Sequence, residues 1–301
     1  MISLIEKYFG FVLILFLVLA VIWPGPGTKM QSLLPVILVI ILTLTFLKVD
    51  ILQVVKQASK PGLMVYIAAV FMIILPVLVF LLFYRFDYTL AIGLMLLACV
   101  PPGVASPAFT DIFGGNTTLS LSVAIILYFI APLSIPLLFY YTISSSIQLD
   151  LLSLAKLLLI LIALPVALSQ VIKYFCAAYI DRSIRYLSGI NIILIASLGY
   201  IGFAPHSHII QSDFSLFLYI VFWLFLMFLM FFVVGVLMMW RSNRGNKIAV
   251  SVSKTYMNNA LAIVIASQYF DSHIVLITVL SSIPWNFTPG ILKKLTMRFV
   301  K

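Results

Sequence analysis

One lysine stands in a stretch of chain that otherwise carries no charge. Lys254 lies within residues 251–260 (SVSKTYMNNA), seven residues after the nearest basic residue, Lys247. Three- and four-residue spacing puts Ser251, Lys254 and Asn258 on one helix face. A lysine at the centre of a bilayer costs about 2.5–3.5 kcal/mol on insertion scales. Such a lysine is either an internal hydrogen-bonded strut or a group that binds and couples a ligand, and we favour the second role.

A second stretch cannot stay in a regular helix. Residues 98–107 (ACVPPGVASP) hold Pro101, Pro102 and Pro107 around Gly103. Each proline lacks an N–H donor and clashes with the preceding turn. In lipid the freed carbonyls must face a cavity or another helix. The pattern therefore predicts a break at a binding site, after which a half-helix beginning near Gly103 directs its positive end toward an anion. A simple kink is the alternative.

The elements that carry these residues are predicted to be membrane helices. Of the 301 residues, 64% are hydrophobic and 9% are charged, against about a quarter charged in soluble domains. The apolar stretches are continuous rather than alternating, which favours helices over a barrel. We expect ten spans, with no room for a second soluble domain, at residues 8–23, 30–47, 62–84, 88–113, 117–142, 150–175, 187–204, 214–240, 246–270 and 273–297.

The basic residues give the topology. With ten spans, one side collects 14 of them, and the other side has Lys29, Arg85 and Lys156. Cytoplasmic loops carry the excess of lysine and arginine, so both termini are predicted to be cytoplasmic. The net charge of +10 is then a topology signal, and no nucleic-acid partner is expected. The 14 residues are Lys7, Lys48, Lys56, Lys60, Lys173, Arg182, Arg185, Arg241, Arg244, Lys247, Lys293, Lys294, Arg298 and Lys301.

Ten spans divide naturally into five and five, residues 1–145 and 146–301. An odd number of spans in each half inverts the second copy, and inverted repeats with broken helices at the midplane are common in secondary transporters. The two spans with the most polar or proline-rich interiors, the fourth and the ninth, hold corresponding places in the halves. The expected fold is therefore all-α and polytopic, with discontinuous helices 4 and 9 that cross.

Two motifs carry a family resemblance. Residues 101–120 read Pro-x-Gly-x-Ala-Ser and then Gly-Asn-x-x-Leu-Ser, and Met257-Asn258-Asn259 precedes a helix of small residues. These segments resemble the bile acid:sodium symporter family. Asn286 stands at the position where that family has a His-Asn pair. The resemblance implies a panel domain, a core domain and an organic anion bound where the broken helices cross. The anion contacts that it implies are Pro102, Gly103, Val104, Ala105, Ser106, Lys254, Asn258, Asn259 and Asn286.

The chain departs from this family where sodium is bound. Lys254 replaces a glutamate that helps to bind sodium, and Val104 replaces a frequent threonine. The resemblance implies that the sodium sites were once formed at Phe71, Ser106, Pro107, Ser120 and Ala124, of which only Ser106 and Ser120 keep an oxygen ligand. One glutamate with two sodium ions carries a net +1, as does one protonated lysine. We therefore expect an atypical member in which Lys254 replaces the bound sodium and meets the anion directly.

Several alternatives stay open at this point. A buried lysine can lose its proton, so protons are a candidate coupling ion, and uncoupled passage is equally compatible. An ordinary sodium-coupled symporter, an auxin-efflux-type carrier and a non-transporting binding or sensor protein share the same plan. An enzyme is not expected, because no HExxH, GxSxG or paired intramembrane carboxylates occur. No cofactor or metal site is expected, and the predicted location is a prokaryotic plasma (inner) membrane.

Overall fold

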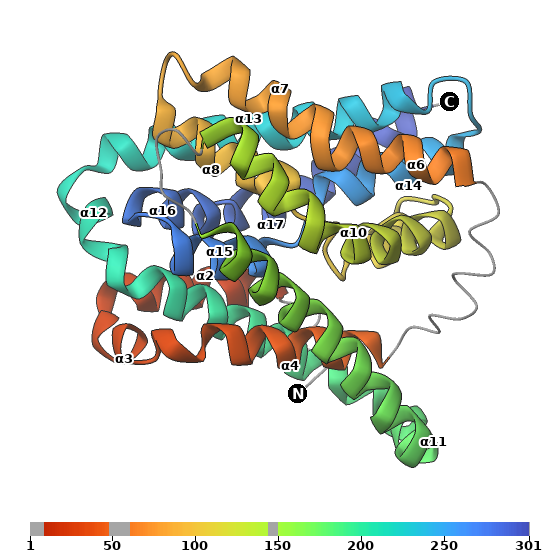
Figure 1. The fold of residues 1–301 in the computed structure, drawn as a ribbon, viewed down its shortest axis with the longest axis horizontal. Coiled ribbons are helices and arrows are strands. Elements are labelled where there is room, and N and C mark those ends of the chain that lie inside the picture. Colours follow the sequence, from red (N-terminus) through yellow and green to blue (C-terminus); the bar gives the residue numbers. More distant parts are fainter. Residues whose placement is uncertain (1–8, 48–60, 144–149, 301) are drawn as a thin grey trace.

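The computed structural model describes residues 9–47, 61–143 and 150–300. Five of the basic residues on which the topology prediction rests lie outside these ranges, namely Lys7, Lys48, Lys56, Lys60 and Lys301. The described elements are helices (Figure 1). The first half contains α2 (Phe9–Ile22), α3 (Pro24–Lys29), η1 (Gln31–Leu33), α4 (Leu34–Phe46), α6 (Pro61–Ala69), the π-turn η2 (Val70–Ile74), α7 (Leu75–Phe83), α8 (Tyr88–Cys99), α9 (Ser106–Ile112) and α10 (Thr117–Ile143).

The second half begins with α11 (Leu151–Phe203), which consists of two helical arms that meet at a kink at Cys176. This half continues with η3 (Ala204–His206), α12 (Ser207–Ser212), α13 (Phe214–Met238), α14 (Arg244–Thr255), α15 (Asn259–Tyr269), α16 (Ser272–Leu280) and α17 (Ser282–Phe299). In the described part, six helical stretches are long and apolar enough to span a membrane, and four shorter apolar helices accompany them. The protein is therefore a polytopic helical membrane protein. The count of ten spans and the inverted repeats remain predictions.

The connection between the sixth and seventh predicted spans differs from our expectation. We predicted a loop over residues 176–186, but the backbone is helical through this region and only Cys176 departs from helical geometry, with φ −127° and ψ 21°. The segment contains no proline or glycine, so nothing in it stops a helix. The two predicted spans are thus the arms of α11, which bends at Cys176.

The helices pack in two groups. α11 makes extensive contacts with α4 and α2, and these three helices lie along one side of the molecule in Figure 1. α7 packs on α8, α13 on α14, and α15 on α16, and these helices belong to the second group. Within the first group, the Tyr200 hydroxyl donates to the Trp23 carbonyl at 2.7 Å and accepts from the Gly27 amide at 3.3 Å. Tyr200 therefore fastens the end of α2 to α11.

Short polar side chains begin several of these helices. Asp87, Asp150, Asp213 and Asp271 each accept hydrogen bonds from the first-turn amides of α8, α11, α13 and α16. A carboxylate at the N-cap satisfies orphan donors and meets the positive end of the helix dipole. Half of the chain's eight acidic residues thus serve at helix starts, where the apolar spans begin.

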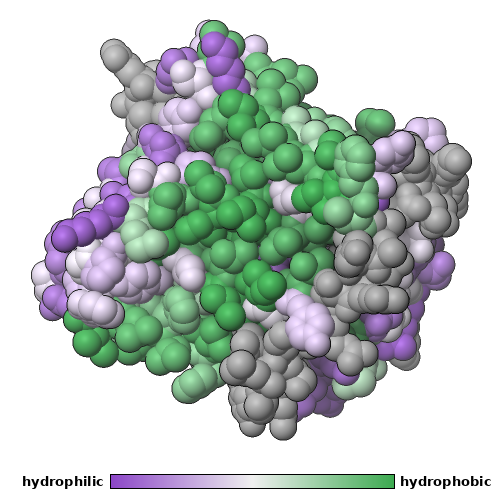
Figure 2. Space-filling model, turned by 90° about the horizontal axis from the view of Figure 1, so that it is seen from below, coloured by the Kyte–Doolittle hydropathy of each residue, from purple (hydrophilic) through white to green (hydrophobic). Residues whose placement is uncertain are grey.

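The surface agrees with a lipid environment. Figure 2 shows a face on which apolar residues cover the middle and hydrophilic residues gather toward the periphery. Large apolar side chains are exposed along α11 and α13, among them Ile160, Phe175, Phe222 and Leu237. In water a continuous patch of this kind would drive association, whereas in a bilayer it meets the acyl chains.

Candidate functional site

The first break lies between α8 and α9. α8 ends at Cys99, and the chain is not helical again until Ser106, three residues later than the start near Gly103 that we predicted. The Val100 amide still reaches the Leu96 carbonyl at 3.3 Å. The next two amides would belong to Pro101 and Pro102, which have no N–H. The break therefore leaves carbonyl acceptors at the end of α8 that its own backbone cannot satisfy.

The second break lies between α14 and α15 and contains no proline. α14 ends at Thr255, and α15 begins at Asn259. The Asn258 side chain caps the new helix, because its Oδ1 accepts from the Leu261 amide at 3.0 Å. Its Nδ2 donates to the Tyr128 hydroxyl of α10 at 2.7 Å. Asn258 thus caps the second half-helix and links the break to the neighbouring helix α10.

The two breaks cross and pair with each other. The Gly103 amide donates to the Tyr256 carbonyl at 2.7 Å, and the Asn258 amide donates to the Pro101 carbonyl at 2.9 Å. These bonds make Pro102 and Met257 an isolated antiparallel bridge. A Cβ on Gly103 would lie 2.8 Å from the Met257 carbonyl oxygen, so the close approach needs glycine. The structure therefore contains the crossing of two discontinuous helices that the sequence indicated.

Lys254 lies beside this crossing and is 2% exposed. Its Nζ donates to the Phe71 carbonyl at 3.2 Å and to the Ala98 carbonyl at the end of α8. The rings of Phe71 and Phe231 face the ammonium, with centroids 5.0 and 4.9 Å away. All four groups are uncharged. A cation at the C-terminal ends of α8 and α14 also meets the negative ends of both helix dipoles.

The predicted sodium positions are spread around the same crossing. Ser120 and Ser253 share a hydrogen bond of 2.8 Å between their hydroxyl oxygens. Ser106 is fully buried, and its hydroxyl has no partner. Ala124 is buried and Pro107 is half-buried, and neither side chain offers an oxygen. Phe71 contributes its backbone carbonyl and its ring to Lys254.

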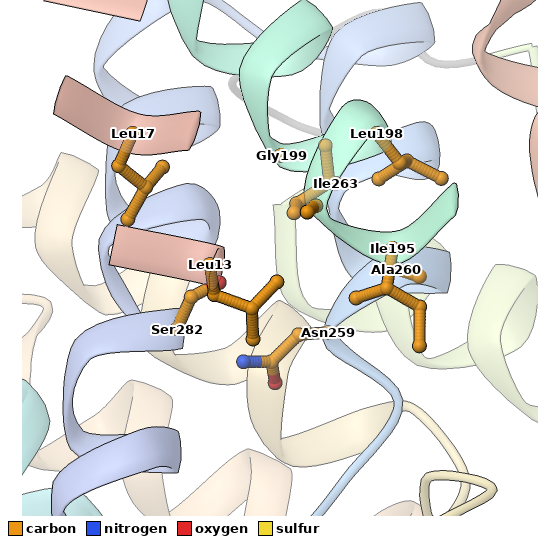
Figure 3. A pocket seen from close by; sticks show the side chains of 10 residues that line it. Leu13, Leu17, Ile195, Leu198, Gly199, Asn259, Ala260, Ile263 and Ser282 are labelled. Carbon is orange, nitrogen blue, oxygen red and sulfur yellow. The ribbon is translucent and has the colours of Figure 1, made fainter. Parts of the chain in front are cut away.

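A small cavity lies where the two helix groups meet, close to the second break. Its volume is about 30 Å³, so it holds one or two water molecules and not an organic anion in this conformation. Figure 3 shows Asn259 at its edge among apolar side chains. The cavity is lined by Leu13, Leu17, Ile195, Ala196, Leu198, Gly199, Asn259, Ala260, Ile263 and Ser282.

Of the predicted anion contacts, only Asn259 lines this cavity. Asn286 lies one helical turn from Ser282, whose carbonyl accepts from the Asn286 Nδ2 at 2.6 Å. The Oδ1 atoms of Asn259 and Asn286 are both buried without a protein partner. Pro102 and Gly103 form the crossing itself, while Val104 and Ala105 are half-buried beside it. Lys254 is not a lining residue.

Sequence reasoning missed three participants. Tyr128 and Ser253 hydrogen-bond residues that we had singled out, and the Ala98 carbonyl binds the lysine. Ser253 carried a usable signal, since it adjoins Lys254 in the most polar span. Tyr128 carried none, because it stands in an ordinary apolar helix. A backbone carbonyl such as that of Ala98 has no signature of its own, although Pro102 four residues later frees it.

One comparison with known proteins gives a match that includes both breaks and the cavity. The model of the SBF-like CPA transporter family matches residues 7–284. Over 269 residues the chain is 23% identical to a protein of Bacillus subtilis (strain 168) named uncharacterized sodium-dependent transporter YocS. That alignment covers 87% of this chain and 82% of the relative.

Proposed function

Because the chain belongs to the SBF-like CPA transporter family, we propose that it is a secondary transporter of a small organic anion that works by alternating access without bound sodium. Membership of this family makes the protein a membrane transporter rather than an enzyme. In the proposed mechanism the Lys254 ammonium takes the place of the bound sodium ions. Its charge equals the net +1 of a glutamate with two sodium ions.

The contacts of Lys254 carry this proposal. A bound cation in a broken-helix transporter holds the crossing segments together through oxygen ligands. Here the Nζ of Lys254 donates to carbonyls of η2 and α8, so one side chain joins three segments. Two further contacts hold the crossing segments together. They are the bridge between Pro102 and Met257 and the hydrogen bond from Asn258 to Tyr128.

The substrate enters, in this proposal, where the two helix groups meet. The cavity at Asn259 lies between α2 and α11 on one side and α15 and α17 on the other. Ligand sites in proteins usually have volumes of about 300–1,000 Å³, so the groups must separate to admit an anion. The amides of Asn259 and Asn286 then meet its polar end, and the aliphatic side chains meet the remainder.

The finer arrangement belongs to the same proposal. Ten spans in two inverted repeats, with both termini cytoplasmic in a prokaryotic plasma membrane, fit the basic residues that flank the helices. α8 with α9 and α14 with α15 are the corresponding broken helices of the two repeats. Protons are the candidate coupling ion, since Lys254 is the one charged side chain at the crossing within the described residues.

Thermal unfolding of purified protein tests the proposal without a known substrate. A panel of carboxylates is added in sodium and in potassium buffer to wild type and Lys254→Ala, because a ligand of the folded state raises its apparent stability. We expect at least one anion to stabilise wild type equally in both buffers, and Lys254→Ala to lose that response. Uptake of the identified anion into proteoliposomes then distinguishes transport from binding alone.

A sodium-coupled symporter is the second candidate, supported by the printed name of the Bacillus relative. It predicts a sodium-specific rise in the unfolding temperature of wild type and uptake that stops in potassium buffer. Lys254→Glu sharpens the choice, because it restores the carboxylate that the related family uses for sodium. Equal uptake by Lys254→Glu and wild type in sodium-free buffer would rule out the role that we assign to Lys254.

A further inference from the structure

We propose that the surroundings of the Lys254 Nζ are an ammonium-binding site in their own right, in which two carbonyls and two phenyl rings accept a primary ammonium ion in preference to sodium. Lys254 is then the permanently attached ligand of this site. The inference extends the proposed role of Lys254 as a built-in cation, but it concerns binding and makes no use of transport.

Both carbonyls are free because a proline stands where their helical donor would be. In η2 the Leu75 amide donates to the Val70 carbonyl, five residues back. The same π-type spacing would give the Phe71 carbonyl to residue 76, which is a proline. The Ala98 carbonyl would take the amide of residue 102, also a proline. One proline in α7 and one in the break after α8 thus leave two acceptors that are directed at the same point.

The rings complete a site that suits an organic cation. An ammonium within about 6 Å of a ring centroid is attracted by the negative face of the ring, and the attraction grows when water is excluded. Both Phe71 and Phe231 meet this distance, at 5.0 and 4.9 Å. Two directed N–H donors satisfy the two carbonyls. Sodium has no such directionality and requires more oxygen ligands than these groups provide.

The lysine stem defines the shape of a test ligand. Replacing Lys254 by alanine removes Cγ, Cδ, Cε and Nζ, which are the heavy atoms of n-propylammonium. The surrounding residues are closely packed, since Val252, Ser253 and Thr255 are also buried. Cavities engineered in well-packed interiors bind molecules that match the deleted atoms. The prolines remain in this variant, so the carbonyls stay free.

The experiment measures the unfolding temperature of Lys254→Ala with n-propylammonium chloride, sodium chloride or 1-propanol at equal concentrations. We expect n-propylammonium alone to raise it, by about 3 °C at ten times the dissociation constant. Wild type and the exposed-site control Lys156→Ala should not respond, because in both proteins the Lys254 side chain already occupies the proposed ammonium site. Adding Phe231→Leu to Lys254→Ala should weaken the response by removing one ring.

Each other outcome counts against the proposal. An equal rise with sodium chloride would mean a general cation site, and an equal rise with 1-propanol would mean that only volume is being filled. If Lys254→Ala unfolds on extraction, the yield of folded protein with each additive becomes the measurement, and no recovery with n-propylammonium overturns the proposal. Sodium-dependent uptake by wild type would refute the proposed function and leave this binding result as it stands.

Discussion

The two broken helices reach the same crossing by different means. Between α8 and α9 the sequence itself prevents a helix, because Pro101 and Pro102 remove two donors in succession. Between α14 and α15 nothing in the sequence forbids a helix, and the break is held by bonds to other segments. Those bonds run from the Asn258 amide to the first break and from the Asn258 side chain to Tyr128.

The difference shows how hydrogen bonds are balanced inside a bilayer. The first break has too few donors, so it leaves carbonyls unpaired, and the second break supplies the missing N–H groups. The Lys254 ammonium replaces the amide that Pro102 lacks, and the Asn258 amide satisfies the Pro101 carbonyl. Buried backbone groups without partners cost several kcal/mol in lipid. Lys254 and the second break therefore supply the N–H donors that the carbonyls of the first break require.

Crowding the bridge should give the largest effect on this pairing. In Gly103→Ala the new Cβ meets the Met257 carbonyl oxygen at 2.8 Å and the Tyr256 carbonyl oxygen at 3.0 Å. Backbone atoms cannot rotate away, so we expect a loss of about 2–3 kcal/mol in the free energy of unfolding. The matched control is Gly62→Ala, since a Cβ there meets nothing within 4 Å. Equal stability of the two variants would show that the breaks are not rigidly paired.

Removing the anchor of the second break should have an intermediate effect. Tyr128→Phe deletes the hydroxyl that accepts from Asn258 at 2.7 Å and leaves a buried donor unpaired. We expect a loss of about 1–2 kcal/mol, measured by thermal unfolding in detergent. Tyr141→Phe is the control, because Tyr141 is exposed. A Tyr128→Phe protein as stable as this control would mean that the hydrogen bond to Tyr128 does not stabilise the second break.

The hydroxyl pair should give the smallest effect. Ser120 on α10 and Ser253 on α14 share one buried hydrogen bond. A double-mutant cycle with both alanine variants should yield a coupling energy of about 1 kcal/mol, because each single change leaves the other hydroxyl without its partner. Additive losses would show that the two serines act independently and that their hydrogen bond does not couple α10 to α14.

The sequence predicted the parts of this site that depend on residue type. The prolines indicated the first break, and the motifs led to a family resemblance that the match over residues 7–284 confirms. The functional role of Lys254 remains a prediction. The partners of Lys254 could not be predicted, because carbonyls occur at every residue and the positions of these two depend on the packing of η2 against α8. The helical connection after the kink at Cys176 was missed because a short polar segment between two apolar ones suggested a loop.

The bridge between Pro102 and Met257 also bears on how the protein is made. The first crossing segment leaves the ribosome long before Lys254 and Asn258 are synthesised, and its carbonyls have no partners until then. Until the second half is inserted, the backbone carbonyls of the first break must therefore be satisfied by water, a lipid headgroup or another protein. Final folding of the site is then a late event that joins the two halves, and a chain cut between them should insert without completing it.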